Sequence, residues 1–347
     1  MVTTCVFCGK PPEDKNKEHI LPQWLLSLTG DPNRTVTFGS NYETGKPISF
    51  SWKSFTVPSC TVCNEKFSDF ENEIKTIVEK LLEKKELTSN EVIKLLDWFD
   101  KVRIGLWHNY YYIEKNKGFI LPRLFINNRA GKKDRFLQIH FLHSEKQQLG
   151  LNAFGVETLS FQYSPTCFAL RVNNLLMING STDFIISKNC GFPYPKKIIP
   201  RDNETLEFSD WEYDRTTHSD IQQIEIAKGV LTAMQPIHSE IKCLSNYYSD
   251  SYLIANTIGV KSQVGTLFRI QNNSCISINN LDTLLEYEDV KGEDCKRAGD
   301  LISMVYKLQN VFLSIQANPK HKETYDFAEK LNIDYIKYYK DLQKNNQ

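Results

Sequence analysis

Two pairs of cysteines near the N-terminus have the residue type and the spacing of a metal site. Cys5 and Cys8 form the first pair and Cys60 and Cys63 the second, with two residues between the cysteines of each pair. Two such turns supply four sulfur ligands, the set that holds Zn²⁺ tetrahedrally in structural sites. Zinc bound by four thiolates has no open position, so we assign it no catalytic part. The alternative is four free thiols in the core.

An acid and a base lie between the two pairs. The gap exceeds the roughly 15–20 residues of a simple zinc ribbon, so a folded segment is expected inside it. Glu18 and His19 are adjacent there, and adjacent side chains of a strand point to opposite faces. One could face a metal ion while the other faces a water molecule or a substrate, before Pro22 ends the strand. The alternative is an ordinary turn in a zinc-binding module.

A helix is expected directly after the second cysteine pair. Apolar residues recur there at helical spacing from Phe67 onwards. Asn64 and Glu71 are seven residues apart and share another face of that helix. Asn64 could bind a metal ion or cap the helix. Glu71 could bind or support a metal ion, or it could be a solvated surface residue.

The order of these features resembles the HNH endonucleases of the ββα-metal class, in the branch where two zinc knuckles hold the nuclease motif together. The resemblance rests on CxxC, then Glu-His-Ile-x-Pro, then CxxC-Asn, and it covers roughly the first fifth of the chain. It implies that His19 is the general base that activates water. It also implies that Glu18 and Asn64 bind one catalytic Mg²⁺ or Mn²⁺, while the four cysteines bind structural zinc. Glu71 is our own addition to the catalytic metal site.

Two positions depart from the family pattern. The family has Asp where this chain has Glu18, so the longer side chain must fold back to reach the same metal ion. The family also has an Asn, which orients the histidine, about five residues before the third cysteine, where this chain has Phe55. Another group must then orient His19, and the sequence offers Asn41 as a candidate.

Phosphodiester hydrolysis matches these residue types. A neutral imidazole, with an ordinary pKa of about 6.5, can take a proton from water. A hard cation on carboxylate and amide oxygens can stabilise the charge on the phosphate oxygens and support the departing 3′-oxygen. We therefore expect a metal-dependent endonuclease that acts on nucleic acid, with DNA as the expected substrate. The alternative is a non-catalytic zinc module that binds nucleic acid or protein.

The composition gives two further expectations. The 347 residues, 41% of them hydrophobic, suffice for two domains and a substantial core. Lys plus Arg equals Asp plus Glu, with 42 of each, although phosphate neutralisation usually provides much of the affinity for nucleic acid. Either basic residues gather locally or a protein partner brings the substrate. A homodimer is another possibility, because a single site that must cut both strands favours one.

The cysteine content and the hydropathy pattern predict a soluble protein of the cytoplasm. No secretory signal and no apolar run near the ~20 residues of a membrane span are visible. Nine cysteines in such a chain indicate a reducing compartment. Five of them lie outside the two pairs and are expected to be buried free thiols, namely Cys167, Cys190, Cys243, Cys275 and Cys295.

The remaining elements follow from periodicity. Residues 35–39 and 48–52 predict a β-hairpin, and residues 66–86 predict a helix. Thr88 and Glu91 form a capping box that opens a second helix, which would pack antiparallel to the first and end in an aromatic cluster at residues 106–112. That cluster could stack bases or fill a seam between domains.

The second half of the chain has a different pattern. Residues 118–199 predict antiparallel strands, with a basic loop at 127–135 that could contact phosphate or be a solvated turn. Residues 202–220 are expected to form a linker or an exposed loop. Two helices, 295–317 and 322–344, would end the chain.

The predicted fold class is α+β, with a zinc-stapled ββα-metal module followed by a helical pair, an antiparallel β region and C-terminal helices. We expect residues 1–86 to form the nuclease module and residues 87–347 to recognise a target, sense a trigger or bind a partner. Proteins of similar pattern occur in bacterial restriction, toxin or phage-defence systems, and the resemblance implies such an antiviral setting.

Overall fold

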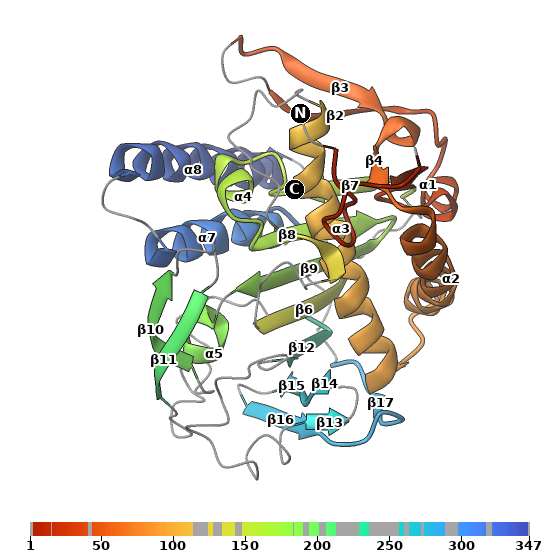
Figure 1. The fold of residues 1–347 in the computed structure, drawn as a ribbon, viewed down its shortest axis with the longest axis vertical. Helices are drawn as coiled ribbons and strands as arrows, with labels where there is room; N and C mark the ends of the chain where they lie inside the picture. The colour runs from red at the N-terminus through yellow and green to blue at the C-terminus, as the bar shows by residue number, and fades with distance from the viewer. Residues whose placement is uncertain are drawn as a thin grey trace.

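Figure 1 shows the fold of the chain in a computed structural model. The residues that the structure describes are 3–14, 16–40, 44–113, 124–127, 134–142, 148–182, 184–189, 194–200, 206–212, 229–235, 257–259, 264–271, 274–288, 298–316 and 321–345. They form a mixed α and β structure in which the strand pairings are antiparallel.

The N-terminal part contains two paired strands and a helix that follows them. Strand β1 (Asn16–His19) pairs antiparallel with β4 (Thr56–Ser59), so that Glu18 lies opposite Val57 and His19 opposite Thr56. Helix α2 (Thr61–Leu82) begins directly after β4. The alternation along β1 buries Glu18 and leaves His19 half-buried, as expected for adjacent residues of a strand. The described order here is strand, strand and helix, and the assignment of these elements to a ββα-metal module stays a prediction.

The segment between β1 and β4 contains a short helix and a hairpin. Helix α1 (Gln23–Leu28) starts after Pro22, whose extended backbone separates it from β1. Strands β2 (Thr35–Ser40) and β3 (Pro47–Ser51) pair antiparallel, which confirms the predicted hairpin. A single 3₁₀ turn (Trp52–Ser54) leads from β3 to β4. Asn41 lies outside the described residues.

Helix α3 (Ser89–Ile113) begins with the predicted capping box. The backbone N–H of Glu91 donates to Thr88 Oγ1 at 3.2 Å, and the N–H of Thr88 donates to Glu91 Oε2 at 2.8 Å. These two bonds satisfy backbone donors that the first turn of a helix leaves open. The short strand β5 (Leu87–Thr88), paired with β17 (Leu284–Leu285), precedes the helix.

Helices α2 and α3 pack antiparallel, as predicted. Lys80 and Glu91 form an ion pair at 2.5 Å near one end of the helix pair, and Glu73 and Lys94 form another. Residue numbers fall along α2 while they rise along α3, which is the order that antiparallel helices require.

The aromatic end of α3 is buried and faces other elements, since Trp107 Nε1 donates to the carbonyl of Gln162 at 2.8 Å. This cluster therefore lies at an internal seam.

A seven-stranded antiparallel sheet forms the centre of the molecule, in the order β16-β15-β12-β6-β9-β8-β7. The strands are β6 (Asp134–Phe141), β7 (Leu151–Phe154), β8 (Cys167–Val172), β9 (Leu175–Thr182), β12 (Leu231–Gln235), β15 (Leu267–Gln271) and β16 (Ser274–Ile278). The antiparallel region expected at 118–199 is thus confirmed, and three further strands come from beyond residue 230.

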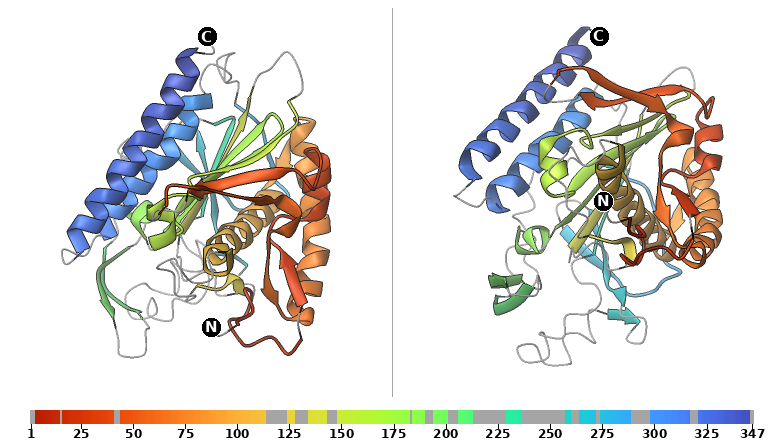
Figure 2. Two further views of the ribbon diagram at one scale, coloured as in Figure 1. Left: turned by 90° about the horizontal axis from the view of Figure 1, so that it is seen from above. Right: turned by 45° about the horizontal axis from the view of Figure 1, so that its top comes forward.

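Helices cover both faces of this sheet (Figure 2). Leu137 and Ile139 of β6 belong to an apolar cluster with α2 and α3, whereas Phe136 belongs to a second cluster with α7 (Ala298–Gln316). Helix α8 (Lys322–Asn345) lies against α7. These two helices confirm the predicted C-terminal pair.

The first apolar cluster crosses the predicted domain boundary at residue 86. Its members come from the N-terminal loop, α2, α3 and the sheet, and include Phe7, Ile74, Trp98, Leu137 and Phe168. Residue 86 lies between α2 and α3, and apolar packing is continuous across it; the division into two domains stays a prediction.

Smaller elements complete the described chain. These are α4 (Leu159–Tyr163), α5 (Ile185–Asn189), the pair β10 (Tyr194–Pro200) and β11 (Leu206–Glu212), and the pair β13 (Thr257–Gly259) and β14 (Val264–Gly265). Strand β11 lies inside the segment expected to be a linker, so that expectation is wrong for residues 206–212. The described helices include none that is both long and apolar enough to cross a lipid bilayer.

Candidate functional site

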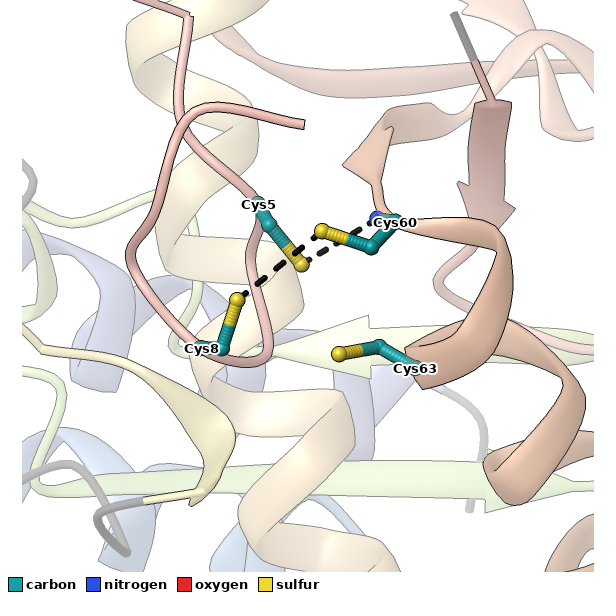
Figure 3. Close-up of side chains that lie close together, drawn as sticks. All are labelled: Cys5, Cys8, Cys60 and Cys63. Carbon is teal, nitrogen blue, oxygen red and sulfur yellow. Dashed lines mark hydrogen bonds between the residues drawn. The ribbon is translucent and has the colours of Figure 1, made fainter. Parts of the chain in front are cut away.

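The four cysteines of the two pairs converge on one point between the N-terminal loop and the start of α2 (Figure 3). Their sulfur atoms all lie within 4.8 Å of one another, and the sulfurs of Cys8 and Cys60 are 3.9 Å apart. Sulfurs placed at about 2.3 Å around a tetrahedral zinc are separated by about 3.8 Å. The cluster therefore fits a metal ion of this type.

Backbone bonds shape the first cysteine turn. The N–H of Cys5 donates to the carbonyl of Lys10 at 2.8 Å, and the N–H of Gly9 donates to the carbonyl of Cys5 at 2.9 Å. Gly9 has a φ of +74°, and a side chain there would also meet the ring of Phe125 at 2.8 Å. The second pair is tied to the first because the N–H of Cys60 donates to Cys5 Sγ at 3.3 Å.

The electrostatics of the cluster also suit a cation. Burial, followed by the neighbouring sulfurs, raises the pKa of Cys60 to about 11 and that of Cys63 to about 12. Several thiolates cannot share this space without a positive charge between them. A bound dication supplies that charge and favours deprotonation of its ligands. These four residues could hold a structural metal ion such as zinc.

Among the described residues, this is the only group of three or more His, Cys, Asp or Glu side chains with such a geometry. The predicted catalytic residues therefore do not form a second cluster of this kind. The chemistry open to each predicted catalytic residue therefore depends on its burial and its hydrogen-bond partners.

His19 ends β1 and is half-buried. Its Nε2 lies 3.3 Å from Nε2 of Gln23, and its Nδ1 has no hydrogen-bond partner among the described residues. Burial lowers the pKa of His19; Glu18 opposes this shift, while Lys101 and Lys53 add to it. The imidazole is thus neutral near pH 7, which is the form that can accept a proton.

Phe55 occupies the position where the family pattern has an orienting Asn. Its ring is buried between Phe50 and Trp52, with ring centroids 4.9 Å and 5.7 Å away. Its backbone carbonyl accepts from the N–H of Ile20, directly after β1, at 3.4 Å. Gln23 contacts the imidazole in this structure. The sequence signal that we missed is that Gln23 lies four residues after His19, at the start of a helix behind Pro22.

Asn64 lies in the first turn of α2, but it does not cap the helix, because Cys60 occupies the N-cap position. Its side-chain Nδ2 donates to the carbonyl of Lys17 at 3.3 Å. This bond links the start of α2 to β1 immediately before Glu18. This bond uses the amide nitrogen and not Oδ1, which is the atom that would bind a cation.

Glu18 points into the interior, where it meets a lysine that the sequence did not single out. Lys101 of α3 is 1% exposed, and its Nζ lies 2.5 Å from Glu18 Oε1. The same Nζ contacts Glu71 Oε1 and lies 3.4 Å from the carbonyl oxygen of His19. Sequence patterns could not reveal this group, because a lysine in a helix is ordinarily a surface residue.

Glu71 is not the solvated helix residue of the alternative interpretation. Its side chain is 13% exposed and pairs with Lys101. Burial raises the pKa of Glu71, and Lys101 opposes that shift. The carboxyl groups of Glu18 and Glu71 therefore meet a single ammonium in a nearly solvent-free space.

Comparisons with models of known protein families, with curated protein sequences and with solved structures find no match.

Proposed function

We propose that this chain is a divalent-metal-dependent HNH endonuclease that hydrolyses phosphodiester bonds of nucleic acid, with DNA as the first substrate to test. One observation carries the proposal. The bond from Asn64 Nδ2 to the carbonyl of Lys17 holds an amide beside the strand that carries Glu18 and His19. An acid, an amide and a neutral imidazole are the groups that metal-assisted hydrolysis of a phosphodiester needs.

His19 would act as the general base. Its lowered pKa keeps the ring able to accept a proton from water near neutral pH. Gln23, at 3.3 Å from Nε2, would orient the ring in place of the Asn that Phe55 replaces.

Glu18 and Asn64 would hold one Mg²⁺ or Mn²⁺, with Glu71 close by. The fit rests on the hard oxygen donors that the carboxyl groups of Glu18 and Glu71 and the amide of Asn64 offer. A bound cation would stabilise charge on the phosphate and on the departing oxygen. The four cysteines would fix the ends of this segment through zinc and would take no part in the reaction.

A second candidate function is a zinc-stabilised binding module without catalysis, which would bind nucleic acid or protein. The observation that favours it is the contact of Lys101 with both carboxylates, since an ammonium already neutralises part of the charge that a metal ion would neutralise. Binding without cleavage in the presence of any divalent cation would support this function.

The test is a cleavage assay on plasmid DNA and on RNA in Mg²⁺, Mn²⁺ or EDTA. We expect nicking or cutting by the wild type with either cation, none in EDTA, and loss of cleavage in His19→Ala. The matched control is His321→Ala, which changes an exposed histidine. Zinc content and circular dichroism would establish that each variant is folded. Equal cleavage by wild type and His19→Ala would contradict the proposal.

The resemblance implies a setting in bacterial restriction or phage defence. Residues beyond 86 would then choose the target, sense a trigger or bind a protein partner, and a homodimer would allow both strands to be cut.

A further inference from the structure

Lys101 joins three elements at one point. Its ammonium contacts Glu18 of β1, Glu71 of α2 and the backbone oxygen of His19, and it comes itself from α3. The zinc cluster gives no reason for this contact, because its ligands are the four cysteines.

Stability alone does not explain the arrangement. A buried ion pair is often no more stabilising than an apolar replacement, because both charges must leave water. Here one ammonium holds the carboxyl groups of two different elements, β1 and α2, in fixed positions.

We propose that Lys101 is a positioning residue for the catalytic metal site. By binding Oε1 of Glu18, it would direct Oε2 towards the cation, and by binding Glu71 it would fix β1 against α2. Carboxylates that bind metals are commonly held in this way by a second group. The contact also gives a reason for Glu in place of the family's Asp, since the longer side chain reaches Lys101. This inference rests on the proposed metal-dependent function.

The test measures binding of Mn²⁺ to zinc-loaded protein without nucleic acid, by electron paramagnetic resonance. We expect Lys101→Met to weaken Mn²⁺ binding by about 10- to 100-fold, and Lys101→Arg, which keeps the charge, to weaken it less. The matched control is Lys94→Met. Lys94 also pairs from α3 to a glutamate of α2, but its side chain is 33% exposed. Its removal should leave Mn²⁺ binding unchanged.

A second comparison tests the same inference if Lys101→Met fails to fold. Glu71→Gln removes one of the two carboxylates, and the double variant Lys101→Met/Glu71→Gln then removes the lysine from a site with a single carboxylate. Positioning by Lys101 predicts that the double variant binds Mn²⁺ more weakly than Glu71→Gln does.

Unchanged Mn²⁺ affinity in folded Lys101→Met would reduce Lys101 to a structural role, and tighter binding would make it a competitor of the metal. Either result overturns the inference, as does a wild type whose Mn²⁺ binding is absent or survives Glu18→Gln. If the wild type binds Mn²⁺ through Glu18 and Lys101 but cuts no nucleic acid, the nuclease proposal fails and this inference stands. If the wild type cuts nucleic acid but wild type and Lys101→Met bind Mn²⁺ equally, this inference fails and the nuclease proposal stands.

Discussion

His19 and His108 differ in burial, and this difference limits the role that each imidazole can have. His19 lies at the end of a strand, half-buried, with a ring nitrogen near Gln23. His108 lies on α3 without exposure to solvent, and its Nε2 bonds the carbonyl oxygen of Leu124 at 2.6 Å. His108 is therefore structural, and of these two histidines His19 is the one with access to solvent.

The burial of His108 predicts a loss of stability in acid. Burial lowers the pKa of His108 to about 4, whereas the unfolded chain titrates near 6.5. Because the unfolded state binds the proton more readily, this stability is complete above about pH 6.5 and is lost as the pH falls towards 4. The full effect is about 3 kcal/mol.

Denaturant unfolding at several pH values measures this effect. The difference in unfolding free energy between pH 7 and pH 5 should be smaller in His108→Gln, which does not titrate, than in the wild type. Identical pH dependence in the two proteins would contradict the assignment.

At the scale of elements, the capping box of α3 offers a local test. Thr88→Ala removes the oxygen that accepts the N–H of Glu91, so the unfolding free energy should fall by about 1 kcal/mol. Thr76→Ala is the matched control. Thr76 is an exposed residue inside α2, where alanine is the better helix former. A loss as large in Thr76→Ala as in Thr88→Ala would show that the cap is not the cause.

The sequence predicted the elements whose signals are local. The β2–β3 hairpin, the box at Thr88 and Glu91, and helices α2, α3, α7 and α8 follow from alternation, helical spacing and capping within a short stretch. The sheet order could not be predicted, because β6 pairs with β12 about a hundred residues later. The linker at 202–220 was predicted from polarity alone, and polar residues also occur in a two-stranded pair such as β10–β11.

Some residues of the candidate site could likewise be predicted from local patterns, and others could not. Spacing identified the four cysteines, which the fold brings together, and alternation predicted that Glu18 and His19 point to opposite sides of a strand, which matches their different burial. Lys101 escaped notice because its partners Glu18 and Glu71 lie 83 and 30 residues away in the sequence. Such a contact depends on how α3 packs, and no local pattern encodes that packing.

At the scale of the whole molecule, residues 1–86 share an apolar cluster with the rest of the chain. Ile74 and Leu81 of α2 belong to the apolar cluster that includes α3 and one face of the sheet. Burying one such side chain contributes about 1.5–3 kcal/mol. A fragment of residues 1–86 would expose several of them at once.

We therefore expect the 1–86 fragment with bound zinc to unfold without a cooperative transition, while the full chain unfolds cooperatively. Thermal unfolding followed by circular dichroism, with zinc content measured in parallel, provides the comparison. A cooperative transition in the fragment would establish residues 1–86 as an independent domain.

The most direct test of the central claim is the rate of plasmid cleavage in Mn²⁺ by wild type and His19→Ala, each carrying one zinc per chain. General base catalysis contributes about 100-fold or more. We predict that the wild type cuts and that His19→Ala is slower by at least about that factor, with His321→Ala unchanged. Absence of cleavage by the wild type, or equal rates for wild type and His19→Ala, would contradict the account.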